Sequence, residues 1–173
     1  MNYDKLFVIM LSFFTLLACA PDISNEERAE NSVSVEQDNV PTAPFIQAML
    51  SEVNSLRANG CKCGSTNMPP VGDVVWNEQL AEAAQRHADD LVKHNIFSHI
   101  GSDRSEVKDR VNDAGYDWTT VGENVAKGYN TVEGVVSGWQ SSEGHCKNMM
   151  NNSFKEVGIA QNGVIWVQVL ASK

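Results

Sequence analysis

The sequence predicts an α+β fold, in which helices pack against a small antiparallel sheet. The chain ends in two apolar segments, residues 157–161 and 164–170, that flank Asn162-Gly163. This dipeptide is the strongest short signal for a β-hairpin, because both central residues of its favoured turn need positive φ. Alternation along the second segment puts Val167 and Val169 on its buried face. Upstream, apolar side chains recur at helical spacing, which completes the α+β prediction.

Two long helices are predicted in the first half of the domain. Residues 45–56 carry one apolar stripe, and Asn59-Gly60 ends this helix. After a short extended piece at residues 74–76, Asn77 is an N-cap for a second helix over residues 78–94. His87 lies on the apolar face of the second helix, and we interpret it as a buried histidine of the core.

Shorter elements follow in the second half. Residues 105–114 predict a third helix. Thr131 caps a fourth helix that runs through Trp139, and another helical turn follows His145. Residues 123–127 predict a further strand of the same sheet as the hairpin.

The N-terminus resembles a bacterial lipoprotein signal. Residues 6–18 form an apolar run, shorter than the roughly 20 residues of an ordinary spanning helix, that ends directly before Cys19. The resemblance implies that residues 1–18 are a lipoprotein signal peptide and that Cys19 is lipidated. The alternative is an ordinary secretory signal with an incidental cysteine. A lipidated Cys19 would anchor the exported protein to a membrane of the bacterial cell envelope, in a leaflet that the sequence does not specify.

The rest of the chain divides into a linker and one domain. Residues 19–44 are rich in acidic, Ser and Asn residues and hold few large apolar side chains, which predicts a flexible, acidic linker. Residues 45–173 suit a single domain. The formal net charge of −9 argues against a nucleic-acid partner, which requires a basic surface.

Three short segments, far apart in the sequence, carry the residues best suited to chemistry. Imidazole and carboxylate groups bind divalent metals or transfer protons near neutral pH. Because the segments are well separated, only the fold could bring His99, Glu123 and His145 together. The segments are Phe97-Ser98-His99, Gly122-Glu123-Asn124 and Gly144-His145-Cys146.

Together with Gly138-Trp139, these segments resemble, in order and spacing, the signature of the CAP superfamily of cysteine-rich secretory, antigen 5 and pathogenesis-related proteins. The resemblance covers roughly Phe45 to the C-terminus and is greatest to the bacterial branch. It implies the SCP domain, a three-layer α-β-α sandwich with a cleft that holds two histidines and acidic residues. His99 and His145 match the two histidines, and Glu123 matches the Glu of the Gly-Glu-Asn motif.

The fourth position of that cleft is less clear. Animal and plant members carry a second Glu on the helix after the tryptophan, and the nearest candidate here is Glu143, in a shifted register. Glu143 is either a cleft residue or a solvated carboxylate. Two neutral imidazoles, His99 and His145, with a carboxylate would suit zinc or another divalent cation. Glu123 could instead hydrogen-bond one histidine and fix its tautomer.

Three cysteines remain if Cys19 is lipidated. Export to an oxidising compartment makes a disulfide the default. The CAP resemblance implies a Cys63–Cys146 pair, with Cys61–Cys146 as the alternative, whereas a bridge between Cys61 and Cys63 would be strained. The remaining cysteine is then free or pairs with another molecule. A zinc site on the two neighbouring cysteines is a weaker alternative, because no second cysteine pair exists.

These residues favour an exported, lipid-anchored envelope domain over an enzyme, with a His/Glu cleft that binds a ligand, with or without a divalent cation. Two other classes of function stay open. The first is a metal-assisted hydrolase of peptide or envelope polymer, with both histidines as metal ligands and Glu123 or Glu143 as the base. The second is a lipid- or sterol-binding module with an apolar groove lined by Trp118, Trp139 and Trp166.

Overall fold

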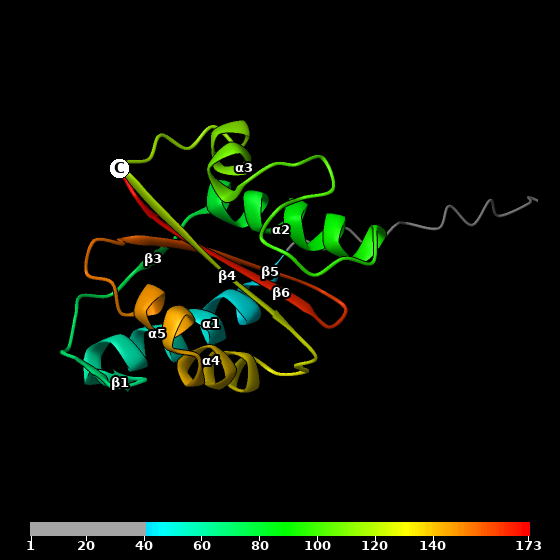
Figure 1. Cartoon of the computed structure of the whole chain (residues 1–173). Helices are drawn as coiled ribbons and strands as arrows, with labels where there is room; N and C mark the ends of the chain where they lie inside the picture. The colour runs from blue at the N-terminus through cyan, green and yellow to red at the C-terminus, as the bar shows by residue number, and fades with distance from the viewer. Residues whose placement is uncertain (1–40) are drawn as a thin grey trace, which may run out of the picture. The chain divides into compact units, whose positions relative to one another are not determined.

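The computed structural model describes residues 41–173 of the chain (Figure 1). The predicted signal peptide, the lipidation of Cys19 and the linker up to residue 40 lie outside the described residues. Within residues 41–173, no helix is both long enough and apolar enough to cross a membrane.

The described residues combine helices with a mainly antiparallel sheet, and the α+β prediction is confirmed. The helices are α1 (Ala43–Asn59), α2 (Glu78–Lys93), α3 (Val107–Asp113), α4 (Val132–Ser141) and α5 (Glu143–Met149). The strands are β1 (Cys61–Cys63), β2 (Thr66–Met68), β3 (Val75–Trp76), β4 (Thr120–Lys127), β5 (Glu156–Asn162) and β6 (Ile165–Ser172). The helix predicted after His145 is α5, which begins two residues before that histidine.

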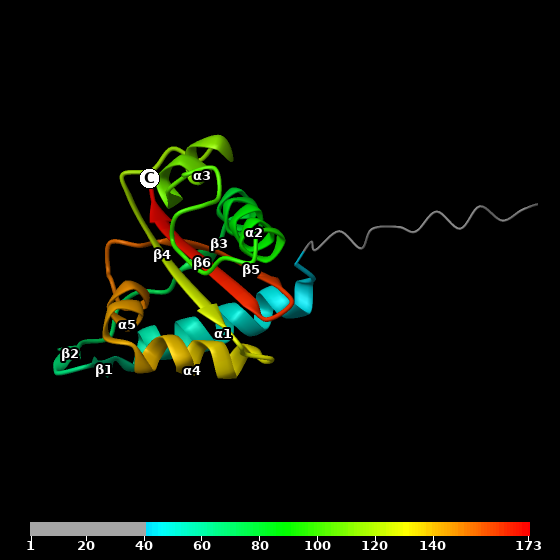
Figure 2. The same ribbon diagram turned by 45° about the vertical axis from the view of Figure 1, so that its right-hand side comes forward.

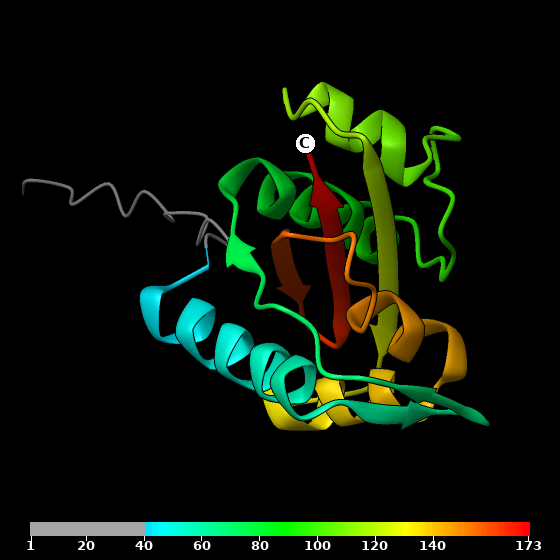
Figure 3. The same cartoon turned by 90° about the vertical axis from the view of Figure 1, so that its left-hand side faces the viewer.

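The main sheet lies between two layers of helices. Its strand order is β3-β5-β6-β4, in which β3 pairs parallel to β5 and the other pairs are antiparallel. Helices α2 and α3 cover one face, and α1, α4 and α5 cover the other (Figures 1 and 2). The separate β1–β2 hairpin follows α1 and lies beside α5 (Figure 3). This arrangement is the three-layer sandwich that the resemblance implied.

Strand β6 is buried on both faces. Each of residues 165–171 is at most 3% exposed. Val167 and Val169 pack in the cluster under α2 and α3, as predicted, while Trp166 and Leu170 pack in the cluster under α1 and α4. The sequence predicted that only the face of Val167 and Val169 is buried. The face of Trp166 and Leu170 is buried as well, because helices cover both sides of the sheet.

The C-terminal hairpin is confirmed, but its turn lies one residue later than predicted. Asn162 pairs with Ile165, so the two turn residues are Gly163 and Val164. Of these two, only Gly163 has positive φ, at +56°. A positive φ at the first central residue alone is typical of a type II′ turn, which favours glycine there. The dipeptide thus predicted the hairpin, while the predicted register and turn type were wrong.

Arg57, near the end of α1, ties that helix to the segment between α5 and β5. Its guanidinium is 0% exposed and donates to four backbone carbonyls. The distances are 2.7 Å to Gly72 O, 2.6 Å to Met149 O, 3.1 Å to Asn151 O and 3.2 Å to Phe154 O. Burial lowers the pKa of Arg57, but an arginine stays charged in proteins. One side chain therefore fixes the path by which the chain leaves α5.

We expect Arg57→Met to lower the free energy of unfolding by at least about 3 kcal/mol, because it leaves several buried carbonyls without donors. Arg86→Met is the matched control. Arg86 makes ion pairs to Asp103 and Asp113, but its side chain is 43% exposed, so the control should cost about 1 kcal/mol or less. Urea unfolding measures both variants, and equal losses would contradict the role given to Arg57.

Candidate functional site

The Gly-Glu-Asn motif lies on β4, at the edge of the sheet. Successive side chains of a strand point to opposite faces. Glu123 accordingly faces the layer of α2 and α3, whereas Asn124 faces the layer of α5. Gly122 lies on the Asn124 side, where an added Cβ would be 2.8 Å from the ring of Phe154. In this motif, Gly122 allows the close approach of the Phe154 ring. Glu123 and Asn124 each direct a polar side chain to a different helical layer.

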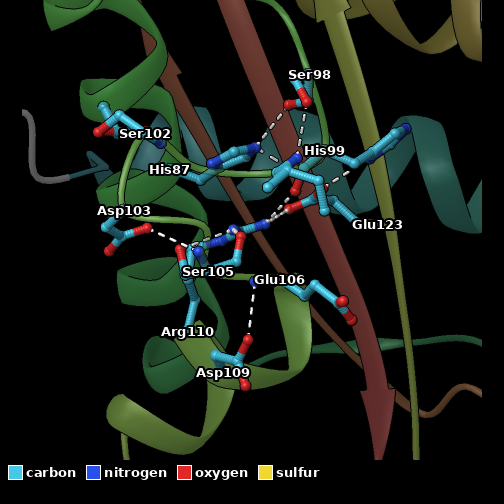
Figure 4. Close-up of polar contacts among 12 residues, drawn as sticks. His87, Ser98, His99, Ser102, Asp103, Ser105, Glu106, Asp109, Arg110 and Glu123 are labelled. Carbon is cyan, nitrogen blue, oxygen red and sulfur yellow. Dashed lines mark hydrogen bonds and ion pairs between the residues drawn. The ribbon is translucent and has the colours of Figure 1, made fainter.

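Glu123 joins a buried cation to an exposed histidine. Its Oε2 accepts a hydrogen bond from Arg110 Nη2 at 2.7 Å, and its Oε1 accepts one from His99 Nδ1 at 2.7 Å (Figure 4). The Glu123 and Arg110 side chains are 3% and 1% exposed, while that of His99 is 57% exposed. Because Nδ1 is bonded to the carboxylate, Nε2 is the ring nitrogen of His99 that remains for a ligand.

The backbone at His99 is held by two buried side chains. His87 Nε2 donates to Ser98 O at 2.9 Å, and Arg110 Nη2 donates to His99 O at 3.2 Å (Figure 4). His87 comes from α2 and Arg110 from α3, and each is at most 1% exposed. The loop that carries His99 is therefore fixed by both helices of its layer. The interpretation of His87 as a core histidine is confirmed, and its contact shows that it also supports the site.

Asn124 performs the corresponding role for His145. Its Nδ2 donates to His145 O at 3.1 Å and to Gln168 Oε1 at 2.8 Å, and its Oδ1 accepts from Asn148 Nδ2 at 2.9 Å. Both His145 and Asn148 belong to α5. Consecutive residues of β4 therefore position the two histidines, one from each helical layer, at the same edge of the sheet.

The pKa values of the two histidines are shifted in opposite directions. The hydrogen bond to Glu123 raises the pKa of His99, although partial burial opposes this effect. Burial lowers the pKa of His145, and the charge of His99 lowers it further. As the pH falls through the neutral range, His99 takes up a proton before His145 does.

A pocket of about 230 Å³ opens beside His99. It is lined by His99, Ile100, Glu106, Val107 and Glu123. The carboxylate of Glu106 also pairs with Lys108 at 2.8 Å, in an exposed position. The pocket therefore offers a ligand one imidazole, an apolar wall and a solvated carboxylate.

Glu143 lies apart from these groups. Its carboxylate pairs with Lys147 at 2.6 Å and lies against Gly64, in the turn of the β1–β2 hairpin. Among residues 41–173, Glu143 makes no hydrogen bond or ion pair with His99 or Glu123. The structure thus joins Glu123 to His99, whereas Glu143 is directed towards the hairpin.

The imidazoles of His99 and His145 alone do not make a complete set of metal ligands. Within the described part of the chain, the one group of three ligand atoms that lie within 4.8 Å of one another is made by Cys61, Cys63 and Cys146. Both oxygens of Glu123 are already bonded to Arg110 and His99. A metal in the cleft would therefore be bound by the two imidazoles and by water or a ligand, with Glu123 orienting His99.

Two of those three cysteines form a disulfide. The structure pairs Cys63 with Cys146, as the resemblance implied, and Cys61 keeps a free thiol. The bridge joins β1 to α5 at the residue that follows His145. The disulfide therefore provides a second anchor for the helix that carries this histidine.

The three tryptophans do not line a common groove. Trp139 and Trp166 are each 1% exposed and lie in the cluster under α1 and α4. Trp118 packs against the other cluster, on the opposite face of the sheet. These side chains fill the core, as aromatic residues of small domains usually do.

Arg110 was not identified from the sequence as the buried partner of Glu123, although the sequence pattern indicates that this arginine is buried. Val107 and Val111 mark the apolar stripe of α3, which continues to the C-cap residue Ala114. Arg110 occupies the same stripe by helical spacing. A charged residue in an apolar stripe requires a buried partner. That partner, Glu123, was already in the candidate set.

The comparisons with known proteins show that the chain belongs to the CAP family. The family described as "CAP: Cysteine-rich secretory protein family" matches residues 50–164, which is more than half of the chain. An extracellular protein containing a SCP domain from Bacillus anthracis str. Ames has a similar crystal structure, with a TM-score of 0.66 and 25% identity. That likeness covers 74% of this chain and 40% of the other.

Two proteins of Bacillus subtilis (strain 168) are similar in sequence. "Uncharacterized membrane protein YlbC" is 35% identical over 97 residues, which is 55% of this chain and 28% of that protein. "Uncharacterized protein YkwD" is 35% identical over 99 residues, which is 56% of this chain and 38% of that protein. The match thus spans well under half the length of either relative.

We expect Glu123→Gln to lower the pKa of His99, because the substitution removes the carboxylate that stabilises the protonated ring. Glu106→Gln is the matched control, since Glu106 lines the same pocket but makes its ion pair with Lys108. Titration of the imidazole NMR signals measures both variants. Equal pKa values for His99 in wild type and Glu123→Gln would contradict the proposed role of the carboxylate.

His87 should make the fold sensitive to acid. Burial lowers its pKa from the ordinary 6.5. Well above pH 6.5 the ring is neutral in both the folded and the unfolded state. Below that pH the unfolded chain takes up a proton that the folded chain refuses, so the free energy of unfolding falls until the folded pKa is reached. We expect a smaller fall for His87→Gln than for wild type, as measured by urea unfolding between neutral and acidic pH.

His94→Gln controls for the substitution itself, because His94 lies at the end of the same helix with a side chain that is 45% exposed. If wild type and His87→Gln lose stability equally on acidification, His87 is not the source of the acid sensitivity.

Proposed function

We propose that this chain is an exported, lipid-anchored CAP-family domain of the bacterial cell envelope. In this proposal its cleft binds a ligand through His99 and His145, together with a divalent cation for which zinc is the first candidate. The domain binds and does not catalyse. The membrane partner is reached through the lipid on Cys19, and the ligand is an envelope component such as a lipid or a peptide.

The single observation that carries the metal proposal is the bond between Glu123 and His99 Nδ1. Histidine ligands of metals usually donate their second ring nitrogen to a carboxylate, which fixes the tautomer and raises the basicity of the ligand nitrogen. Here the carboxylate is itself held by the buried Arg110. His145, whose lowered pKa favours the neutral ring, would supply the second imidazole. Two protein ligands would leave positions open for a bound molecule.

The position of the carboxylates favours binding over hydrolysis. A general base must reach the water or hydroxyl that it deprotonates. Glu123 uses both oxygens for Arg110 and His99, and Glu143 pairs with Lys147 outside the cleft. Neither of the two bases considered from the sequence is therefore free beside the histidines. A lipid-binding module lined by tryptophans is disfavoured because Trp139 and Trp166 fill the core.

Export and anchoring rest on the N-terminal sequence. The apolar run of residues 6–18 ends before Cys19, as in lipoprotein signals. Among the relatives, YlbC is named a membrane protein and the Bacillus anthracis protein is named extracellular. Both names are consistent with an exported domain.

Zinc titration calorimetry on the full-length chain tests the proposal. We expect saturable one-to-one binding that the double variant His99→Ala/His145→Ala abolishes, and that Glu123→Gln weakens by about 10- to 100-fold. His94→Ala should bind as wild type does, because its exposed histidine lies on α2, outside the cleft. Cys61→Ser should also bind normally, which excludes the free thiol as the ligand.

No binding by wild type, or binding that survives the double substitution, would refute the metal cleft. Hydrolysis of envelope peptides or polymers that disappears in His145→Ala would instead favour the enzymatic alternative.

A further inference from the structure

Three sulfur atoms meet where β1 faces α5. Cys61 and Cys63 are two residues apart on β1, so both side chains point to the same face of the strand. Cys63 and Cys146 form the disulfide and are 0% exposed, while Cys61 is partly exposed. The Cys61 Sγ lies 3.5 Å from the Cys146 Sγ and 3.7 Å from the Cys63 Sγ. A free thiol that solvent can reach thus contacts a disulfide that solvent cannot reach.

We propose that Cys61, Cys63 and Cys146 form a thiol–disulfide exchange site, through which small thiols in solution reach the buried bridge. In the first step, the Cys61 thiolate attacks the Cys146 sulfur. A Cys61–Cys146 bond forms, the Cys63–Cys146 bond breaks, and Cys63 leaves as a thiolate that takes up the proton released by Cys61. This isomerisation needs no oxidant or reductant.

The second step opens the bridge. A small thiolate attacks the accessible Cys61 sulfur of the new bond, forms a mixed disulfide with Cys61 and releases the Cys146 thiolate. A second small thiol then reduces the mixed disulfide and restores the Cys61 thiol. The two small thiols are oxidised to their disulfide, and the protein bridge is reduced to two thiols. Without Cys61, a thiol must reach a sulfur that is 0% exposed.

The exchange would affect α5, because one end of the disulfide lies on this helix. Cys146 follows His145 directly, and both lie on α5. Either bridge keeps α5 attached to β1, whereas the reduced form leaves α5 without a covalent anchor. The site would therefore let the thiol content of the surroundings control how firmly the helix that carries His145 is held. This inference does not require a metal or a ligand in the cleft.

The first test determines, in the full-length chain, which of Cys61, Cys63 and Cys146 carries the free thiol. The oxidised protein is incubated at about pH 8.5, where thiolate is more abundant, and the free thiol is trapped with a maleimide after acidification. Trypsin cleaves after Arg57 and Lys62, so Cys61 and Cys63 fall in different peptides. We expect the label on Cys63 to rise with incubation time. Label that stays on Cys61 alone throughout would overturn the exchange step.

The second test measures reduction of the bridge by a small thiol in folded protein. We expect Cys61→Ser, whose bridge has no exchange partner, to be reduced about tenfold more slowly than wild type. Lys62→Ser is the matched control, because residue 62 is exposed on the other face of β1 and the variant keeps all three sulfurs. Equal reduction rates for wild type and Cys61→Ser would overturn the role of Cys61 as the point of entry.

A third variant separates exchange from misfolding. Cys63→Ser should fold with a Cys61–Cys146 bridge, since these two sulfurs are already 3.5 Å apart. Recovery of this bridge in digests of the folded variant supports the proposal. A folded Cys63→Ser chain with two free thiols after oxidation would contradict it.

Discussion

Burial of β6 on both faces is the constraint from which the layers of this domain follow. A strand with no solvent-exposed side needs neighbours on both edges and a helical layer on each face. Strands β4 and β5 supply the edges. The cluster under α2 and α3 covers one face, and the cluster under α1 and α4 covers the other. Gln168, the polar residue in the middle of β6, bonds to Asn124 across the strand pair, so the central strand also connects to the candidate site.

Strand β4 is the edge strand of the main sheet. Within residues 41–173 no strand lies beyond β4, so side chains from both helical layers can approach this edge. Glu123 and Asn124 use the alternation of the strand to bind one layer each. Glu123 positions His99 through a hydrogen bond to the imidazole ring. Asn124 positions His145 through a hydrogen bond to the backbone carbonyl of that histidine. Both histidines are thus positioned by contacts to neighbouring residues of one strand.

The sequence predicted what depends on local pattern and on the family motif. The helices appear within a few residues of their predicted bounds. Of the three residues that the motif proposed, His99 and Glu123 are hydrogen-bonded in the structure. What the sequence did not predict depends on pairing between distant segments. The hairpin register follows from which residue opposes Asn162, and the partner of Arg110 follows from packing of α3 against β4. The direction of Glu143 depends on Lys147 and on the β1–β2 hairpin, which no spacing from Trp139 encodes.

The Arg110–Glu123 ion pair is almost fully buried, and its role is best understood from what an apolar pair at the same place could not do. Burying two charges carries a desolvation penalty that well-packed apolar residues would avoid. Arg110 and His87, the two buried side chains that hold the backbone at His99, also have polar atoms without a partner among the described residues. These atoms are Arg110 Nε and His87 Nδ1. Apolar side chains surround this position in the cluster under α2 and α3, so an apolar substitute is physically reasonable. The charged pair achieves one result that an apolar core could not: it fixes the ring of His99, with one nitrogen bonded and the other open to the cleft.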